Sequence, residues 1–433
     1  MNKTRNKASA GLARATLAAA ALIGSLCASP AMAAAPAVIT MDGAYLELAK
    51  QRIAANEPTL GPAYAKLLQD ANAALGMQPE AVTRKKITPP SGDKHDYLSL
   101  APYWWPDPGQ PDGLPYMQRD GEFNPSSKNS DTDSVRMQLM CLGTQTLSLA
   151  YYFTGEQKYA KKGADFIRAW FLDPATRMNP NLNFGQAVMG RTNGRGIGLI
   201  DTRNMWMVID AVQILQASGE LSAKEVADMK QWFKDFSSWM LNSDLGIEEF
   251  IAHNNHGTFY DMQVANYALF AGDTALAKRT VQRGVDLRIA GQISIEGKQY
   301  AELERTTPFH YAAFNLDAMT HIARYGEQLK VNVWTARDKT RGLRNGINYM
   351  MPFALNPKSW PYKELNGEAE TELMLPVLLR AERAYGGGQY ASAVRALPVT
   401  TLNTQEIIAY AKTLNTPAPT TLNSIDRLIW PVK

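Results

Sequence analysis

Three short segments of the chain share one pattern, in which a helical stretch is closed by glycine and a second helical stretch follows at once. They are residues 153–160 (FTGEQKYA), 270–277 (FAGDTALA) and 385–391 (YGGGQYA). Glycine is common just past a helix end because it adopts the left-handed conformation without strain. Repeated helix pairs joined in this way stack into solenoids or close into toroids. The pattern therefore predicts an all-α fold built from helical hairpins.

Most of the remaining chain is predicted to be helical because apolar residues recur every three or four positions. This periodicity predicts helices over residues 131–153, 157–171, 205–216, 223–241, 258–270, 274–289, 311–325, 335–350 and 368–385. Two long stretches without it, residues 88–129 and 179–201, are typical of functional loops. We expect residues 34–433 to form a single domain, an (α/α) toroid or incomplete barrel whose long loops line a cleft.

The first 33 residues differ from the rest of the chain in charge. They hold four of the 45 Lys and Arg and no acid, followed by an apolar stretch and Ala31-Met32-Ala33. This pattern predicts a signal peptide over residues 1–33, cleaved after Ala33, and a periplasmic or secreted protein without a membrane anchor. Without this segment 41 basic residues face 41 acidic ones. A neutral body is not expected to bind nucleic acid.

Four of the five histidines fall within residues 253–321, and two of them frame the string HNNHG at 253–257. Consecutive asparagines lower helix propensity, which indicates that they serve through their side chains. An amide can donate to a carboxylate, and a neutral imidazole can accept a proton. Asn255 and His256 are therefore candidate catalytic residues, and His253 and Asn254 candidate substrate contacts. A capping cluster at a helix start is the alternative.

A metal site is a further interpretation of the same string. His253 and His256 could share a helix face, and Glu248 and Glu249 lie just upstream. The spacing matches no standard zinc motif, and the chain has no cysteine cluster. We therefore expect neither a metal ion nor another cofactor.

A second string, ELERTTPFHY, covers residues 302–311. Arg305 offers a permanently charged, bidentate grip for a carboxylate. Tyr311, at a predicted helix start, is suited to donate a proton or, beside cations, to accept one. His310 is expected to contact the substrate beside them. The alternative is a simple salt bridge from Arg305 to Glu302 or Glu304.

Aromatic and basic residues mark the two predicted loops. Large flat rings in a proline-framed loop are good platforms for sugar rings, although one of the two tryptophans is expected to pack the loop down. The glycine-rich stretch 194–198 lacks the strand and spacing of a nucleotide loop, so its basic residues are interpreted as contacts for an acidic ligand. The predicted substrate-binding residues of these loops are Tyr103, Trp104, Trp105, Arg191, Asn193 and Arg195.

Taken together, Asn-Asn-His before a helix, Arg followed by Tyr, and the YWWPDP loop resemble the alginate-lyase superfamily. The six-residue spacing between Arg305 and Tyr311 resembles polysaccharide lyase family 38 more than family 5. The resemblance runs from the YWWPDP loop to residues 360–362. It implies an (α/α) toroid, metal-independent β-elimination on a uronate polymer, and a catalytic set of Asn255, His256, Arg305 and Tyr311.

These residue types suit that chemistry. Elimination across a 4-linked uronate removes the C5 proton, builds negative charge on the carboxylate and protonates the departing O4. Asn255 and Arg305 are expected to bind the carboxylate and Tyr311 to protonate O4, with Tyr311 or His256 as the base. The expected partner is an anionic uronate polysaccharide, such as glucuronan or mannuronate-type alginate. The sequence leaves the choice of polymer, endo or exo action and the oligomeric state open.

Two other function classes are compatible with the sequence. A glycoside hydrolase acting on acidic oligosaccharides needs two carboxyl groups, available among Glu248, Glu249, Glu302, Glu304 and Asp201. A non-catalytic periplasmic glycan-binding protein would use the aromatic loop but give no role to Arg305 and Tyr311. Ultraviolet absorbance separates the classes, because only lysis creates a C4–C5 double bond conjugated with the carboxylate.

Overall fold

The computed structural model describes residues 35–365, 367–397 and 422–432 of the 433-residue chain. The predicted signal peptide, residues 1–33, lies outside the described residues. The described part belongs to one structural unit that spans residues 35–433.

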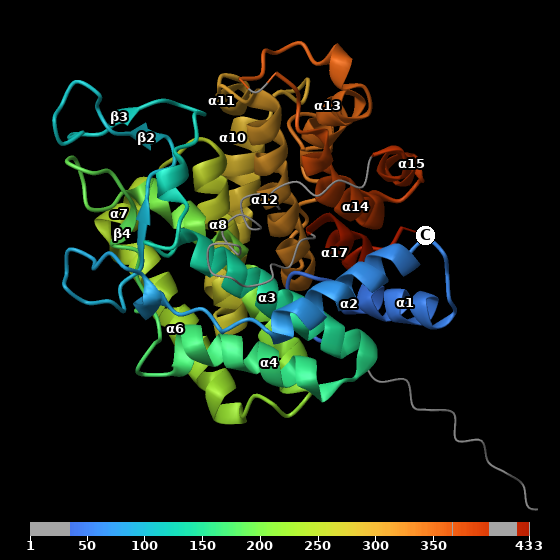
Figure 1. Ribbon diagram of the computed structural model, residues 1–433. Helices are drawn as coiled ribbons and strands as arrows, with labels where there is room; N and C mark the ends of the chain where they lie inside the picture. Colours follow the sequence, from blue (N-terminus) through green and yellow to red (C-terminus); the bar gives the residue numbers. More distant parts are fainter. Residues whose placement is uncertain (1–34, 366, 398–421, 433) are drawn as a thin grey trace, which may run out of the picture. The chain divides into compact units, whose positions relative to one another are not determined.

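Helices dominate this unit, as predicted (Figure 1). The α-helices are α1 (Gly43–Ala54), α2 (Gly61–Leu75), α3 (Ser134–Thr154), α4 (Gln157–Ile167), α5 (Trp206–Gln216), α6 (Ala223–Asn242), α7 (Asp244–Phe250), α8 (Asn255–Ala271), α9 (Thr274–Arg283), α10 (Ala290–Gln292), α11 (Tyr300–Leu303), α12 (Pro308–Leu329), α13 (Leu343–Leu355), α14 (Met374–Tyr385), α15 (Gln389–Ala396) and α17 (Leu422–Ile429). Short 3₁₀ or π-helical segments are η1 (Val82–Arg84), η2 (Pro125–Ser127), η3 (Arg168–Leu172), η4 (Gly196–Met205), η5 (Gly284–Ile289), η6 (Pro357–Ser359) and η7 (Thr371–Leu373).

The described strands are short and lie in the two predicted loops. β1 (Leu98–Leu100) pairs in parallel with β4 (Phe184–Ala187), and β2 (Trp104–Trp105) pairs antiparallel with β3 (Met117–Gln118). Figure 1 shows β2 and β3 as an arm at the upper left, with β4 and α7 below it. The loops therefore bring the predicted aromatic and basic residues to one side of the helices.

Glycine closes the predicted hairpins as expected. Gly155 ends α3 with φ of 74°, and Gly272 ends α8 with φ of 87°. Gly386, with φ of 64°, follows α14 at the third repeat of the pattern. Each turn leads directly into the next helix. The helical-hairpin prediction is confirmed at all three positions.

Contacts between helices run around a closed ring. In order, α2 packs on α3, α3 on α5, α5 on α8, α8 on α12, α12 on α14, α14 on α17, and α17 again on α2. An outer set packs against this ring, with α4 on α3, α6 and α9 on α8, and α13 and α15 on α14. This two-layered ring confirms the prediction of an all-α toroid.

Several predicted helix boundaries are wrong. α8 begins at Asn255 rather than at 258, because the Asn254 side chain caps it by accepting a hydrogen bond from the His256 backbone N–H at 3.2 Å. α13 begins at Leu343 rather than at 335, since residues 336–341 form turns. Similarly, α14 begins at Met374 rather than at 368, after the short segment η7. The helices α1 and α2 were not predicted.

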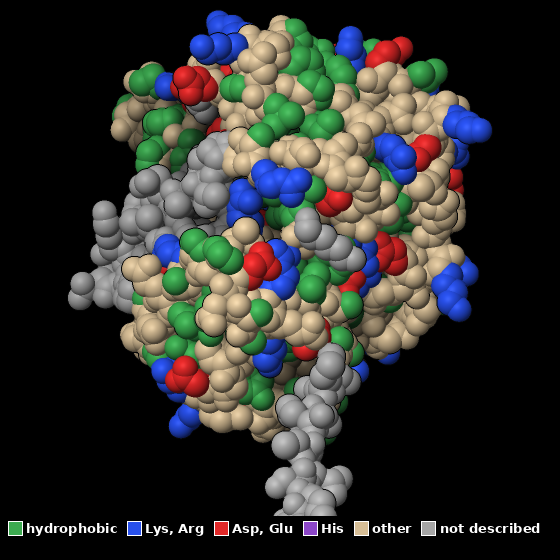
Figure 2. All heavy atoms as spheres, turned by 90° about the vertical axis from the view of Figure 1, so that its right-hand side faces the viewer, with side chains coloured by type: hydrophobic (Ala, Val, Ile, Leu, Met, Phe, Trp, Pro, Cys, Tyr) green, Lys and Arg blue, Asp and Glu red, His purple; other side chains and the backbone are tan. Residues whose placement is uncertain are grey.

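The surface and the helix lengths bear on possible partners. Among the described helices, none is both long and apolar enough to cross a membrane. Figure 2 shows Lys and Arg side chains interspersed with Asp and Glu on the face it displays. On this face, therefore, charges of the two signs are mixed.

Candidate active site

Two consecutive segments supply the second predicted string. Arg305 follows α11, and Tyr311 lies in the first turn of α12, which begins with Pro308. Proline is favoured there because the first helical N–H has no partner to lose. The Arg305 guanidinium lies over the Tyr311 ring, with Cζ 3.7 Å from the ring centroid. The two predicted catalytic residues are therefore in direct contact.

The Tyr311 hydroxyl is held by two neighbours. It accepts a hydrogen bond from Arg305 Nη2 at 2.9 Å, and its oxygen lies 2.8 Å from the Tyr103 hydroxyl oxygen. Burial, and next the nearby Tyr103, raise the pKa of Tyr311 above its ordinary value, although Arg305 acts in the opposite direction. Tyr311 is therefore protonated at neutral pH, as a proton donor must be.

Asp120 is the carboxylate partner of Arg305. Arg305 Nη2 donates to Asp120 Oδ1 at 2.8 Å, and Nε donates to Oδ2 at 3.3 Å. The alternative prediction of a salt bridge to Glu302 or Glu304 is wrong. Asp120 lies just after β3 in the first long loop, and sequence reasoning did not single it out. Its bidentate contact demonstrates how Arg305 can grip a carboxylate.

The start of α8 is fixed by a buried carboxylate. The Asn255 backbone N–H donates to Glu302 Oε1 at 2.5 Å, and Asn255 Nδ2 donates to Glu302 Oε2 at 2.7 Å. Both side chains are buried, and Asn255 Oδ1 has no hydrogen-bond partner in the part of the chain that the structure describes. Glu302 was predicted as a possible hydrolase carboxylate or as an ion-pair partner of Arg305. In the structure it instead accepts hydrogen bonds from the main chain and the side chain of the predicted catalytic Asn255.

His256 is paired with a second buried carboxylate. Its Nδ1 lies 2.9 Å from Glu249 Oε1, at the end of α7, and the Glu249 side chain is fully buried. Burial raises the pKa of Glu249, and the interaction with His256 lowers it in part. When Glu249 is ionised it can only accept, so Nδ1 carries the proton and Nε2 is left to exchange one.

The two predicted strings meet through Glu302. Burial raises the pKa of Glu302, whereas its hydrogen bonds with Asn255 and the charges of Arg305 and His256 lower it. Helices α8 and α12, whose first turns carry His256 and Tyr311, pack side by side. All four predicted catalytic residues therefore lie in one neighbourhood.

Two arginines lie close to the ring of Trp104, one of the predicted sugar-binding aromatic residues. Trp104 and Trp105 are both half-buried. The Arg191 guanidinium lies 5.3 Å and that of Arg195 5.8 Å from the Trp104 ring centroid. Arg195 also donates to Gln186, a buried residue with φ of 49° at the end of β4. Backbone strain of this kind is often retained at functional sites.

The other predicted contacts are less closely tied to this group. Trp105 donates from Nε1 to the Glu122 carbonyl at 3.0 Å, which fastens it to the loop. His310 Nδ1 lies 2.6 Å from Glu370 Oε2, and the His310 ring packs on Tyr311 with centroids 5.2 Å apart. His253 and Asn193 are exposed.

Four of the five carboxylates that a hydrolase could use are engaged in other contacts, those of Glu249 and Glu302 as described above. Asp201 accepts hydrogen bonds from Tyr97, Ser99 and Gln186, and Glu248 accepts from the Gly196 backbone N–H. Glu304 is exposed. Across the described residues, no group of three or more His, Cys, Asp or Glu side chains is arranged to hold a metal ion.

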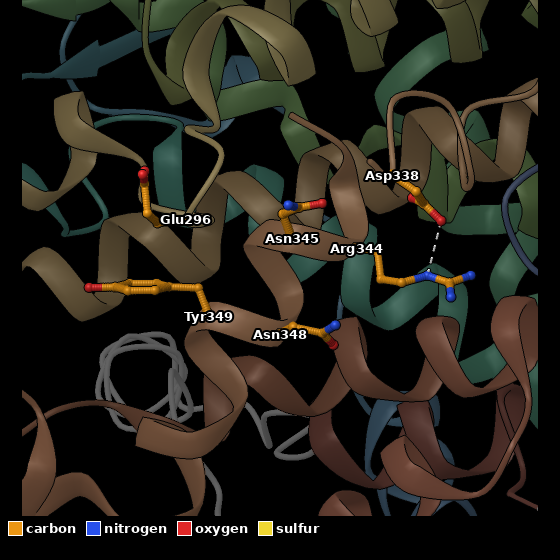
Figure 3. Close-up of a pocket in the computed structure, with 6 residues that line it drawn as sticks. All are labelled: Glu296, Asp338, Arg344, Asn345, Asn348 and Tyr349. Carbon is orange, nitrogen blue, oxygen red and sulfur yellow. Dashed lines mark ion pairs between the residues drawn. The ribbon is translucent and has the colours of Figure 1, made fainter. Parts of the chain in front are cut away.

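A surface depression of about 350 Å³ lies away from these residues (Figure 3). Its lining comes from Glu296, Asp338 and helix α13, and none of the predicted site residues contributes to it. Figure 3 shows Arg344 turned toward Asp338, with which it forms an ion pair of 3.2 Å. This depression plays no part in the arrangement above.

Comparisons with known proteins define the class. A family model described as alginate lyase matches residues 81–360. The crystal structure of an alginate lyase from Bacteroides ovatus is 35% identical and has a TM-score of 0.81, over 92% of this chain and 100% of that chain. Alginate lyase A1-III from Sphingomonas species A1 is 13% identical with a TM-score of 0.50, over 76% and 88% of the two chains, and shows a shared fold. No curated protein matches the chain significantly.

The protein is therefore a polysaccharide lyase built on an all-α toroid. More narrowly, the chain belongs to the alginate lyase family, which confirms the resemblance to the alginate-lyase superfamily drawn from its sequence.

Proposed function

We propose that this lyase cleaves 4-linked uronate polymers, of the glucuronan or mannuronate-rich alginate type, by β-elimination that leaves a 4,5-unsaturated uronate end. The observation that carries this proposal is the buried Tyr311 hydroxyl, held between the Arg305 guanidinium and the Tyr103 hydroxyl. A proton donor beside a carboxylate-binding cation is what elimination next to a carboxylate requires.

Arg305 binds and polarises the uronate carboxylate. Removal of the C5 proton turns that group into an aci-carboxylate that carries more negative charge than the ground state. A fixed cation in a water-poor site stabilises this charge more in the transition state than before it. The forked N–H groups of Arg305 suit a carboxylate, and in this structure they donate to the carboxylate of Asp120. Substrate binding on Arg305 therefore displaces or shares the Asp120 contact.

Asn255 acts from a more buried position than the sequence suggested. Its side chain is fully buried and its Nδ2 is engaged with Glu302. A contact with the substrate carboxylate uses the remaining Nδ2 hydrogen and needs the first turn of α8 to open slightly. In the structure, the hydrogen bonds between Asn255 and Glu302 fix the first turn of α8 and with it the position of His256.

Tyr311 delivers the proton to O4, because its raised pKa keeps it protonated at neutral pH and its hydroxyl lies beside the carboxylate-binding Arg305. In glucuronate and mannuronate, H5 and O4 lie on the same side of the ring. One residue can then make both transfers, provided that it acts first as a phenolate stabilised by Arg305. The phenolate takes the C5 proton, and the phenol so formed delivers that proton to O4, which restores the phenolate. In guluronate or iduronate the two atoms lie on opposite sides, and His256, oriented by Glu249, serves as the base.

The decisive experiment is Tyr311→Phe, assayed by the rise in ultraviolet absorbance on a panel of uronate polymers. The substitution keeps the ring that stacks on Arg305 and removes only the hydroxyl. General acid–base catalysis is worth roughly 10²–10⁴-fold in rate, so kcat should fall by that factor while KM changes little. A folded Tyr311→Phe protein with near-normal kcat on its best polymer would contradict the assignment.

His256→Ala separates the two bases. If Tyr311 carries both proton transfers, the His256→Ala protein retains measurable activity on glucuronan or polymannuronate. If His256 is the base, activity is almost abolished and the preferred polymer contains guluronate or iduronate. Thermal unfolding of each variant serves as the control for folding.

A further inference from the structure

A cavity of about 150 Å³ lies at the centre of the helical ring. Its lining comes from six helices of the ring, α3, α5, α8, α12, α14 and α17, and from the segments η4 and η7. None of the predicted site residues lines it. The cavity therefore lies on the axis of the toroid and is not part of the site described above.

The helices that carry the proposed catalytic residues also lead to this axial cavity. Phe314 and His321, which line it, follow Tyr311 on α12 by three and ten residues, about 4.5 and 15 Å at ~1.5 Å per residue. Phe259 follows His256 by three residues on α8. The Phe314 ring packs on the rings of both Phe259, at 4.2 Å, and His310, at 5.7 Å. The cavity thus begins one helical turn from the catalytic neighbourhood.

Polar groups in the cavity lack protein partners. Gln145 is 1% exposed, and neither its Nε2 nor its Oε1 has a hydrogen-bond partner among the described residues. His321 is 2% exposed, and within the same part of the chain its Nδ1 has no partner either. An unsatisfied buried polar group costs about 1–3 kcal/mol, so three such atoms around one cavity indicate a polar occupant. The occupant needs both donors and acceptors, because Gln145 presents one of each.

The remaining lining suits a sugar acid. Trp206, Phe259 and Phe314 offer apolar ring surfaces, the usual complement to the faces of a pyranose ring. Arg203 lines the cavity with its guanidinium 5.4 Å from the Phe314 ring centroid, and it forms no ion pair with any described residue. The volume equals about five water molecules at ~30 Å³ each, which is room for one sugar ring.

The acids in the lining do not make the cavity strongly negative. Asp317 forms an ion pair with Arg380, which also lines the cavity. Burial raises the pKa of Asp426 to about 7, while Arg380 lowers it in part. Glu372 is the third acid of the lining, which also holds the two guanidinium groups of Arg203 and Arg380. A single carboxylate is therefore admitted without large repulsion.

We propose that the axial cavity is a subsite for one uronate residue of the substrate, whose carboxylate pairs with Arg203 and whose hydroxyls bond to Gln145 and His321. The inference rests on the proposed function, because the sugar chain that reaches Tyr311 is the one that would enter the cavity.

The test measures binding of glucuronate and of glucose, its neutral analogue, by calorimetry, to the wild-type protein, Gln145→Met and Arg203→Met. Gln145→Met keeps the side-chain length and removes an amide that forms no hydrogen bond with any described residue, so its thermal stability should not fall. The dissociation constant of glucuronate should rise about tenfold, the equivalent of one or two lost hydrogen bonds. Arg203→Met should abolish the preference for glucuronate over glucose.

Failure of this inference is distinguishable from failure of the proposed function. If uronate polymers are cleaved but both variants bind glucuronate as the wild type does, the cavity holds water only and the subsite is wrong. The same conclusion follows if the wild type binds no glucuronate at millimolar concentration. If no uronate polymer gives ultraviolet absorbance, the proposed function fails and the subsite proposal fails with it.

Discussion

Glu302→Gln tests whether the start of α8 has to be held in place for catalysis. In the structure one carboxylate oxygen accepts from the Asn255 backbone N–H and the other from Asn255 Nδ2. Glutamine has nearly the same shape but replaces one of these acceptors by an NH₂ group. Whichever way the amide is turned, a donor then faces a donor, so one of the two hydrogen bonds is lost.

The magnitude follows from the chemistry of that contact. A hydrogen bond to a charged group contributes about 1.5–3 kcal/mol, and each 1.4 kcal/mol is about tenfold in a rate or equilibrium constant. If the contact is needed to hold Asn255 and the neighbouring His256 in their productive positions, kcat/KM should fall by roughly 10- to 100-fold. Most of the loss should appear in kcat, because Glu302 is buried behind Asn255 and Arg305 still binds the carboxylate.

Glu304→Gln is the matched control, since Glu304 lies two residues further on and is exposed. Both variants are assayed by ultraviolet absorbance on the same polymer, and urea denaturation measures the change in unfolding free energy. Glu304→Gln should behave as the wild type. A Glu302→Gln protein that keeps its kcat would refute the reasoning, as would one that loses stability and activity only in proportion to its unfolded fraction.

Three further outcomes are expected. Trp104→Ala should raise KM more than it lowers kcat, because a sugar platform acts in the ground state and the transition state alike; a variant that merely unfolds would favour the packing role instead. Activity should survive exhaustive EDTA treatment, and loss that a divalent cation restores would overturn the metal-free mechanism. Because burial raises the pKa of Tyr311, the protonated acid persists as the pH rises, so kcat should stay level up to about pH 10. A pH profile in which kcat already falls near neutral pH would point to a different acid.

The helical architecture was predictable because its signals are local. Apolar periodicity and the glycines at 155, 272 and 386 act within a few residues, and they marked the hairpins correctly. The helices α1 and α2 escaped prediction, although α2 (GPAYAKLLQDANAAL) is rich in alanine and has proline at its start. Such a segment is stabilised by packing on α3 and α17, which no local pattern reveals.

The partners of the site residues were not predictable in the same way. Asp120 meets Arg305 across 185 residues of sequence, and Glu302 meets Asn255 across 47. The sequence placed Glu302 beside Arg305 and suggested an ion pair between them, but the fold turns the carboxylate toward α8. Such pairings depend on how the loops and helices pack, so sequence reasoning named the candidate catalytic residues and missed the groups that hold them.

The HNNHG string caps a helix, as one of its two interpretations predicted, and the cap also places the candidate catalytic residues. Asn254 caps α8 and thereby sets its first residue, so that Asn255 and His256 occupy the first turn. In that turn Asn255 meets Glu302 and His256 meets Glu249. Gly257 completes the string because a Cβ there would lie 2.1 Å from the Ala252 carbonyl oxygen, closer than any side chain tolerates. The close approach of the preceding turn is what brings Glu249 within reach of His256, so the capping residue and the glycine are as necessary to the site as the two side chains between them.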